Sequence, residues 1–184
     1  MKPLLPVLGL FAALLVGGCD NKESAANAPP PVALTAEAIG HYCGMALVEH
    51  PGPKGQILLR GSDRPVWFSS ARDAIAFTML AEEAKTLRAI YVSDMGRAET
   101  WDQPGATNWV EARRAHFVVG SDRRGGMGAE EAVPFGDRQV AERFATEHGG
   151  RVLAFTQIPR DWVLGGEDAP TPALSSPAAS RHTH

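Results

Sequence analysis

Two sulfur-bearing side chains stand close together in the stretch HYCGM, where Met45 follows two positions after Cys43. If this stretch is a strand, the alternation of side chains places His41, Cys43 and Met45 on one face. Thiolate and thioether sulfur select Cu(I), whereas zinc sites use more cysteine or histidine and little thioether. The stretch therefore indicates a copper site supplied by Cys43, with Met45 and His41 as further candidate ligands.

Cys43 has two other interpretations. A free cysteine is often a buried small hydrophobic residue. A thiol can also act as a nucleophile beside a base, although no orienting Asp or Asn stands near this one. The sequence holds two cysteines, and because the N-terminal motif accounts for Cys19, Cys43 has no partner for an intramolecular disulfide. Burial, nucleophilic catalysis and metal binding are all open on these residues alone.

A second candidate ligand is Met127 in the stretch RRGGMGAEE. Its neighbours are glycines and charged residues, so this apolar side chain has little local core to join. The glycines allow tight backbone turns. The alternative is a loop methionine that tucks under a sheet. Met79, on an apolar helical face, is expected in the core, and Met95, after a strand, is a weaker candidate.

The N-terminus has the pattern of a lipoprotein signal. Met1 and Lys2 form a short positive region, and an apolar run over residues 4–16 ends in VGGC. This run is too short to span a membrane. A small-residue run that ends in cysteine predicts cleavage just before Cys19 and acylation of its thiol, which anchors the chain to a membrane. We therefore expect a periplasmic, lipid-anchored protein, with the inner or the outer membrane both open.

Composition sets the domain organisation. The chain has 184 residues and a formal net charge of -3. It has no strongly basic region with interleaved aromatic residues, so nothing predicts nucleic-acid binding. We expect a signal peptide over residues 1–18, a flexible Pro-rich tether over 19–38 and one folded domain over 39–164. Residues 165–184 are rich in Pro, Ala and Ser and are expected to be a disordered tail.

The folded part contains two similar segments. Strand-like runs at residues 55–60 and 115–121 are each followed by a short run that ends at Phe68 or Phe135. Helical stripes then cover residues 71–80 and 140–148, and β-rich runs follow at 88–94 and 151–158. Ser70 resembles a helix N-cap, and Gly149 is expected to end the second helix. The sequence thus predicts an α+β fold of two tandem β-β-α-β units, with helices packed on mainly antiparallel sheet.

These motifs, taken in order, carry a resemblance to a known family. The lipobox, YCGM, FSSARDAIAF, YVSD, WVEARRAHFVVGS and GGMGAEEAVPF are similar to the NosL family of lipoprotein copper chaperones. The resemblance covers about residues 40 to 157. It implies a tandem β-β-α-β fold and Cu(I) held by sulfur, with the family's thiol at Cys43 and its Met-Gly methionine at Met127. The third ligand position is then solvent or an imidazole.

The resemblance also implies partners. A NosL-like protein supplies copper to the metal centres of periplasmic nitrous oxide reductase, beside a membrane ABC-type transporter complex, by ligand exchange and without enzymatic activity. The family often reads Pro-Met-Gly where this chain has Gly126-Met127-Gly128, and Asp where it has Ser69. Asp94 and Trp109 match family positions. Four arginines are candidates to steer an acidic partner, or form a solvated basic face: Arg113, Arg114, Arg123 and Arg124.

Three alternatives accompany this interpretation. The first is another periplasmic copper carrier or sensor of the same fold. The second is a thiol-dependent enzyme with Cys43 as its nucleophile, which would tolerate Met127→Ala. The third is a metal-free lipoprotein adaptor in which Cys43 is merely buried.

Overall fold

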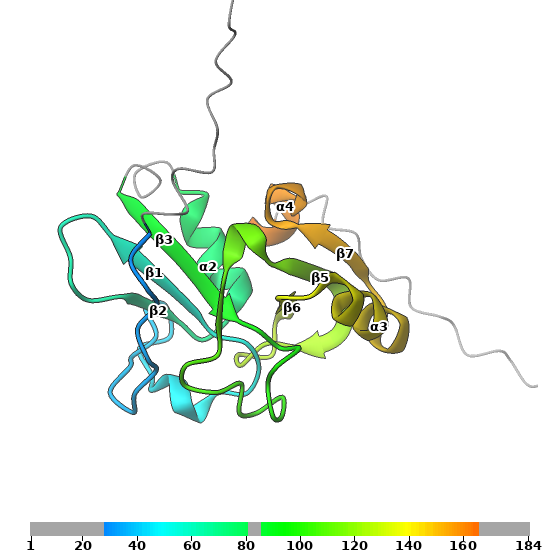
Figure 1. Cartoon of the computed structure of the whole chain (residues 1–184), viewed down its shortest axis with the longest axis horizontal. Helices are drawn as coiled ribbons and strands as arrows, with labels where there is room; N and C mark the ends of the chain where they lie inside the picture. Colours follow the sequence, from blue (N-terminus) through cyan, green and yellow to red (C-terminus); the bar gives the residue numbers. More distant parts are fainter. Residues whose placement is uncertain (1–27, 81–85, 166–184) are drawn as a thin grey trace, which may run out of the picture.

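The computed structural model describes residues 28–80 and 86–165 and contains two units of the same order (Figure 1). The first unit consists of β1 (Gly55–Leu59), β2 (Val66–Phe68), α2 (Ala71–Thr78) and β3 (Leu87–Ser93). The second consists of β5 (His116–Arg124), β6 (Glu130–Phe135), α3 (Arg138–His148) and β7 (Arg151–Ala154). Between them lies β4 (Trp109–Glu111), and α4 (Arg160–Leu164) follows β7. The predicted tandem β-β-α-β fold is confirmed.

The strands form two antiparallel sheets. The first has the order β2-β1-β3-β4 and the second the order β6-β5-β7. Every pair of neighbouring strands is antiparallel. Helix α2 contacts β1 and β3 of its own unit and also β6 of the other, whereas α3 packs on β5, β6 and β7. The sheets stand side by side, with α2 against the first and α3 against the second (Figure 1).

Helix α2 begins and packs as the sequence predicts. The Ser70 hydroxyl accepts a hydrogen bond from the Asp73 amide at 3.2 Å, which satisfies one of the free N–H groups of the first turn. Ala71, Ala74, Ile75 and Phe77 are buried. Helix α3 has an Asp137 N-cap and ends at Gly149, whose φ is 75°. All residues of α3 are described by the structure, and Ala141 is the one that is buried.

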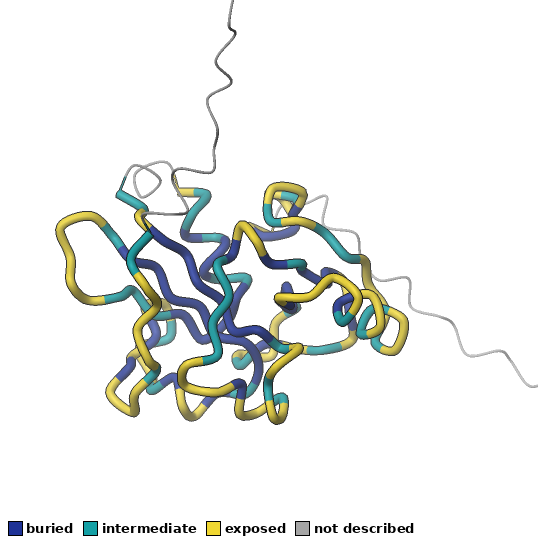
Figure 2. Tube along the Cα trace, in the orientation of Figure 1, coloured by how far each residue is buried: buried dark blue, intermediate teal, exposed yellow. Residues whose placement is uncertain are grey.

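The two units share one hydrophobic core. Its largest cluster joins Ile57, Phe68, Ile75 and Ile90 of the first unit to Phe117 and Ala132 of the second. A second cluster under α3 contains Val118, Val133 and Phe135. Buried segments of both units meet in the middle of the molecule (Figure 2). Since apolar burial is the dominant favourable term in folding, this shared core fixes the two units against each other.

The chain before β1 lies against the first sheet. The Gln56 side chain, fully buried, accepts from the Val32 amide and donates to the Val32 carbonyl, both at 2.8 Å. The Tyr91 hydroxyl donates to the Pro29 carbonyl at 2.7 Å. Residues from Ala28 onward are thus held on the sheet, although they belong to the segment expected to be a flexible tether.

The signal peptide, Cys19 and the tail fall in residues 1–27 and 166–184, outside the described residues. Within 28–80 and 86–165, the helices are too short or too polar to cross a membrane.

Candidate functional site

The stretch that carries Cys43 is a tight turn, so its interpretation as a strand is wrong. An antiparallel bridge joins Ile39 to Ala46 at the base of the turn. Within the turn, the Gly44 amide donates to the Gly40 carbonyl and the Gly40 amide to the Met45 carbonyl, both at 2.9 Å. Gly44 has a φ of 66°, which reverses the chain. The alternation that would place residues 41, 43 and 45 on one face therefore does not apply.

The turn is attached to the edge of the first sheet. The His41 amide donates to the Trp67 carbonyl of β2 at 2.7 Å. The His41 ring lies 5.8 Å from the Phe68 ring and 5.5 Å from the Phe77 ring, between centroids. His41 therefore anchors the turn on β2 and α2 by packing.

The Cys43 thiol is free and half-buried. Its sulfur folds back over Gly40, because a Cβ added to Gly40 would lie 2.5 Å from Sγ and 3.3 Å from Leu47 Cδ1. The thiol is thus held on one side by the turn backbone and stays partly open to solvent on the other. This placement leaves the thiol accessible to a metal ion or to another reagent.

Met45 and its neighbours form an exposed apolar strip in the same segment as this thiol. Met45 is 39% exposed, and Ile39, Tyr42 and Val48 are more exposed still. A methionine in that position is accessible to a metal. His41, in contrast, has its ring packed against two phenylalanines. Met45 and His41 as ligands stay predictions.

Met127 lies in the turn between β5 and β6 and is 53% exposed. The turn closes through a hydrogen bond from the Gly125 amide to the Ala129 carbonyl at 2.9 Å and one from the Gly128 amide to the Gly125 carbonyl at 2.8 Å. This exposure excludes the alternative in which the methionine tucks under the sheet. The thioether is accessible, as a metal ligand requires.

The Met127 turn rests on the first unit. A Cβ added to Gly126 would lie 2.6 Å from His50 Cβ, 3.0 Å from the Pro51 carbonyl oxygen and 3.2 Å from the Ser69 carbonyl oxygen. The His50 ring nitrogen Nδ1 lies 3.3 Å from the Gly126 carbonyl oxygen. Only glycine allows this approach of the two backbones. The departure from the family's Pro-Met-Gly thus coincides with a close contact between the two units.

The two sulfur-bearing turns are fastened to the same place, the junction of β2 with α2. The Cys43 turn packs on it through Phe68, and the Met127 turn packs on it through Ser69. Met127 also lines a cavity of about 250 Å³ with Asp73 of α2. Phe77, one helical turn after Asp73 and on the same face, meets His41. The fold therefore brings the turn that carries Cys43 and the turn that carries Met127 to one region of the molecule.

Other potential ligands are sparse. Among residues 28–80 and 86–165, no group of three or more His, Cys, Asp or Glu side chains has an arrangement that could hold a metal ion. The accessible soft donors near the β2–α2 junction are the sulfur atoms of Cys43 and Met127. That donor set fits the Cu(I) preference expected from the sequence.

Two buried charged residues that the motifs do not single out lie near the Met127 turn. Lys54 and Glu131 are each 1% exposed. Burial lowers the pKa of Lys54 to about 8, and its ammonium donates to the carbonyls of Pro51 and Gly52. Burial also raises the pKa of Glu131 to about 7. The sequence does carry a signal for Glu131, because in EEAVPF it alternates with Val133 and Phe135 and so shares their core-facing side.

Asp94, which matches a family position, makes structural contacts between the two units. Asp94 Oδ1 accepts from the Gly96 amide at 3.0 Å and from the Gly136 amide at 2.9 Å, which ties the end of β3 to the second unit.

Three of the four arginines are engaged within the chain: Arg113 with Glu111 at 3.2 Å, Arg124 with Glu130 at 3.6 Å, and Arg123 over the Trp101 ring at 4.3 Å. These contacts favour local surface roles over a common basic face.

Comparison with known proteins places this geometry in context. The chain is 51% identical to the copper-binding lipoprotein NosL of Achromobacter cycloclastes over 159 residues, 86% of this chain and 81% of that protein. It is 34% identical to the copper-binding lipoprotein NosL of Stutzerimonas stutzeri over 152 residues, 83% of this chain and 78% of that protein.

Its fold is similar to the crystal structure of the copper chaperone NosL from Shewanella denitrificans. The TM-score is 0.67 at 34% identity, over 72% of this chain and 98% of that one. The family model for NosL matches residues 31–163. Because this match covers both β-β-α-β units and both sulfur-bearing turns, the chain belongs to the NosL family.

Proposed function

We propose that this chain is a membrane-anchored Cu(I) chaperone in which Cys43 and Met127 bind one copper ion. The observation that carries the proposal is the attachment of two separate turns, each bearing an accessible sulfur atom, to the β2–α2 junction through His41 and Gly126. The NosL relatives, named as copper-binding lipoproteins and a copper chaperone, support the same function.

The chemistry of this pair suits a carrier. Thiolate and thioether are soft donors that prefer Cu(I) to harder ions. Binding releases the Cys43 proton, since the thiolate and not the thiol is the ligand. Two protein ligands leave a further coordination position, which His41, Met45 or solvent can occupy. A ligand from a partner enters there before the chaperone's donors leave, so transfer proceeds by exchange with no bond-making catalysis.

The partner and the location follow from the family and from the N-terminal motif. Acylated Cys19 would hold the protein at a membrane, with its body in the periplasm. Copper would pass to nitrous oxide reductase, beside a membrane ABC-type transporter complex that assembles its copper centres. The half-open Cys43 thiol and the exposed Met127 thioether support delivery to another protein because both donors are accessible at the surface.

An anaerobic Cu(I) competition titration tests the binding site. The chain from position 19 onward, carrying Cys19→Ser, is compared with the same chain carrying Cys43→Ala, Met127→Ala or Met45→Ala. Met95→Leu is the matched control, because Met95 packs beside Trp101 and away from the two sulfur-bearing turns. We expect Cys43→Ala and Met127→Ala each to weaken binding at least about tenfold, which is about 1.4 kcal/mol or more, and the control to bind as the unmodified site does.

Two outcomes would contradict the proposal. If the unmodified site competes no better than the variants, the copper assignment fails. If Cys43→Ala abolishes function in cells while Met127→Ala has no effect on copper binding or on function, Cys43 acts as a nucleophile and the thiol-dependent alternative replaces the proposal.

A further inference from the structure

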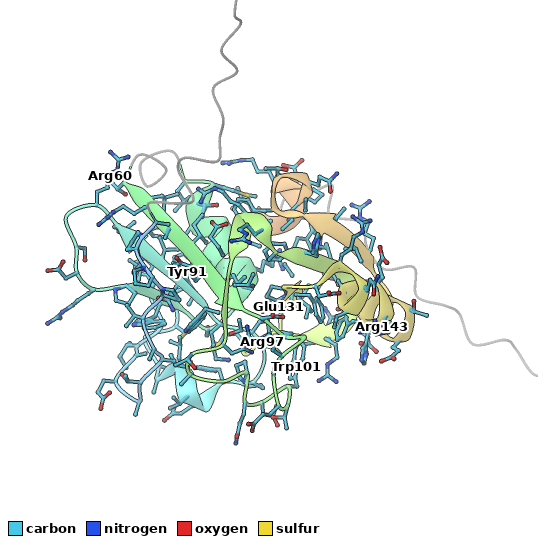
Figure 3. The ribbon with its side chains drawn as sticks, in the orientation of Figure 1. Arg60, Tyr91, Arg97, Trp101, Glu131 and Arg143 are labelled. Atoms are coloured by element: carbon cyan, nitrogen blue, oxygen red, sulfur yellow. The ribbon has the colours of Figure 1, made fainter. Side chains whose placement is uncertain are left out.

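The Glu131 carboxyl group bridges the two units from inside the protein. It lies on β6, near the middle of the molecule (Figure 3), and its carboxyl group lies against Gly125 of the Met127 turn. Its Oε1 atom accepts hydrogen bonds from the Arg72 amide at 2.8 Å, the Ala132 amide at 2.9 Å and the Ser70 hydroxyl at 3.3 Å. Two of these donors belong to the first turn of α2. A side chain of the second unit therefore caps a helix of the first.

The other carboxyl oxygen faces the Met127 turn. A Cβ added to Gly125 would lie 2.6 Å from Glu131 Oε2. Within the described residues, Oε2 has no hydrogen-bond partner. Glu131 therefore packs against the turn with one oxygen and accepts hydrogen bonds from α2 with the other, so its side chain lies between them.

Other charged groups surround this carboxyl. Lys54 precedes β1, and its ammonium is bonded to the Pro51 carbonyl, whose oxygen also lies against Gly126. Asp73 of α2 adds a like charge, and its own pKa is raised by burial. His50 lies under Gly126. The Met127 turn thus packs on a group of buried polar side chains that includes Glu131, His50 and Lys54.

We propose that Glu131 is a positioning residue that holds the Met127 turn against the first unit, and so sets where the thioether stands relative to Cys43. The consequence for copper rests on the proposed function. The placement of the turn itself does not, because it is a property of the metal-free protein.

The sign of the pH dependence follows from burial. Seated under the turn, Glu131 has a pKa raised to about 7, chiefly because burial disfavours its charged form. Lifting the turn hydrates the carboxyl and returns its pKa toward the ordinary value. Deprotonation therefore favours the lifted turn, so the turn is held more firmly below pH 7 than above it.

The test uses the metal-free chain from position 19 onward with Cys19→Ser. Amide hydrogen exchange at residues 125–128 and the methyl NMR signal of Met127 are followed at pH 6 and pH 8, with the Met45 methyl as an internal reference. We expect protection at the turn, corrected for intrinsic exchange, to fall by up to about tenfold from pH 6 to pH 8. Glu131→Gln, which imitates the neutral carboxyl, should keep the turn protected at both pH values.

Two further variants complete the set. Glu131→Ala removes the acceptor and should leave the turn unprotected at both pH values and weaken Cu(I) binding at least several-fold. Glu142→Gln is the control, because Glu142 lies on the exposed face of α3 and pairs with Arg138. If Glu131→Ala does not fold, the comparison of Glu131→Gln with the parent chain still decides the matter.

Each result has one meaning. Turn protection that is the same in the parent chain, Glu131→Gln and Glu131→Ala at both pH values overturns the proposal. If protection changes as expected but the parent chain binds no copper, the positioning role of Glu131 is supported and only the proposed copper function is contradicted. Expected changes in protection with unaltered copper affinity would show that Glu131 holds the turn without setting the thioether for copper, and would overturn the second half of the proposal.

Discussion

The hairpin between β5 and β6 and the hairpin between β1 and β2 occupy equivalent positions in the two units, yet they have different surroundings. The first unit's turn, residues 60–64, is exposed and charged, and the Ser62 hydroxyl bonds only to its own turn through Arg64. Gly61 and Gly128 both have positive φ, 76° and 78°, with open space around them. Gly126, in contrast, lies against the backbone of the other unit.

This difference shows how a repeat acquires a function. The same supersecondary plan supplies two hairpins, and only the hairpin that docks on the other unit carries a methionine. The docked turn has two glycines without room for a side chain, and the buried Glu131 carboxyl group lies against one of them. The free hairpin has neither feature. The comparison predicts that changes to the second unit's hairpin alter copper binding, whereas equivalent changes to the first do not.

The largest expected effect concerns the helices. Ile75 of α2 is fully buried between the sheets, whereas Val140 of α3 is only partly buried. We expect Ile75→Ala to lower the free energy of unfolding by about 3 to 4 kcal/mol and Val140→Ala by about 1 kcal/mol. Chemical denaturation of both variants measures the difference. Equal losses would contradict the central position of α2.

The next effect is the pH dependence of stability from Glu131. Its pKa is raised from 4.5 to about 7 in the folded state, so the folded protein retains a proton that the unfolded chain has already released. This contribution is present below pH 4.5 and is lost as the pH rises to about 7, by on the order of 3 kcal/mol.

Denaturation of the parent chain and of Glu131→Gln across this pH range measures the contribution. We expect the stability of Glu131→Gln relative to the parent to rise with pH between about 4.5 and 7. A constant difference across the range would mean that Glu131 has an ordinary pKa.

A smaller effect separates the two hairpins directly. Gly126→Ala forces apart the backbones of the two units, and we expect a loss of about 2 kcal/mol together with weaker Cu(I) binding. Gly61→Ala should cost about 1 kcal/mol through its positive φ, with Cu(I) binding unchanged. Denaturation and Cu(I) competition on both variants provide the comparison. Unchanged copper affinity in Gly126→Ala would separate the docking of the turn from metal binding.

The smallest effect concerns the helix caps. Ser70 caps α2 and also donates to Glu131, whereas Asp137 caps α3 at the surface. We expect Ser70→Ala to cost about 1.5 kcal/mol and Asp137→Ala about 1 kcal/mol, because only the first leaves a buried carboxyl with fewer donors. Thermal unfolding of the two variants is sensitive enough to rank them. The reverse order would argue against the inter-unit role of Ser70.

The sequence predicts the repeated elements well because their signals are local. Alternation marks β1 and β5, helical stripes mark α2 and α3, and Ser70 and Gly149 mark helix ends where the structure has them. The short β4 escapes detection because three residues give no periodicity. The stretch HYCGM could be a strand from its sequence alone. The chain turns there instead, because Gly44 adopts a positive φ.

The features that bring the candidate site together are less visible in sequence. Three such features depend on residues far apart in the chain. Glu131 and Lys54 are buried, Gly126 packs against Pro51, and Val32 is hydrogen-bonded to Gln56. Such contacts depend on tertiary packing, which local patterns do not specify. Cys43 and Met127 are indicated by their chemistry and by the family resemblance, and their joint role as ligands is still a prediction.

The measurement that tests this role most directly is X-ray absorption at the copper and selenium edges of the Cu(I)-loaded chain, with Met45→Leu throughout and selenomethionine in place of the remaining methionines. We expect copper to be bonded to one thiolate sulfur and to selenium, with the copper–selenium bond absent in Met127→Leu and retained in Met95→Leu. A copper site without selenium, or one that keeps selenium in Met127→Leu, would contradict the claim that Cys43 and Met127 together hold the ion.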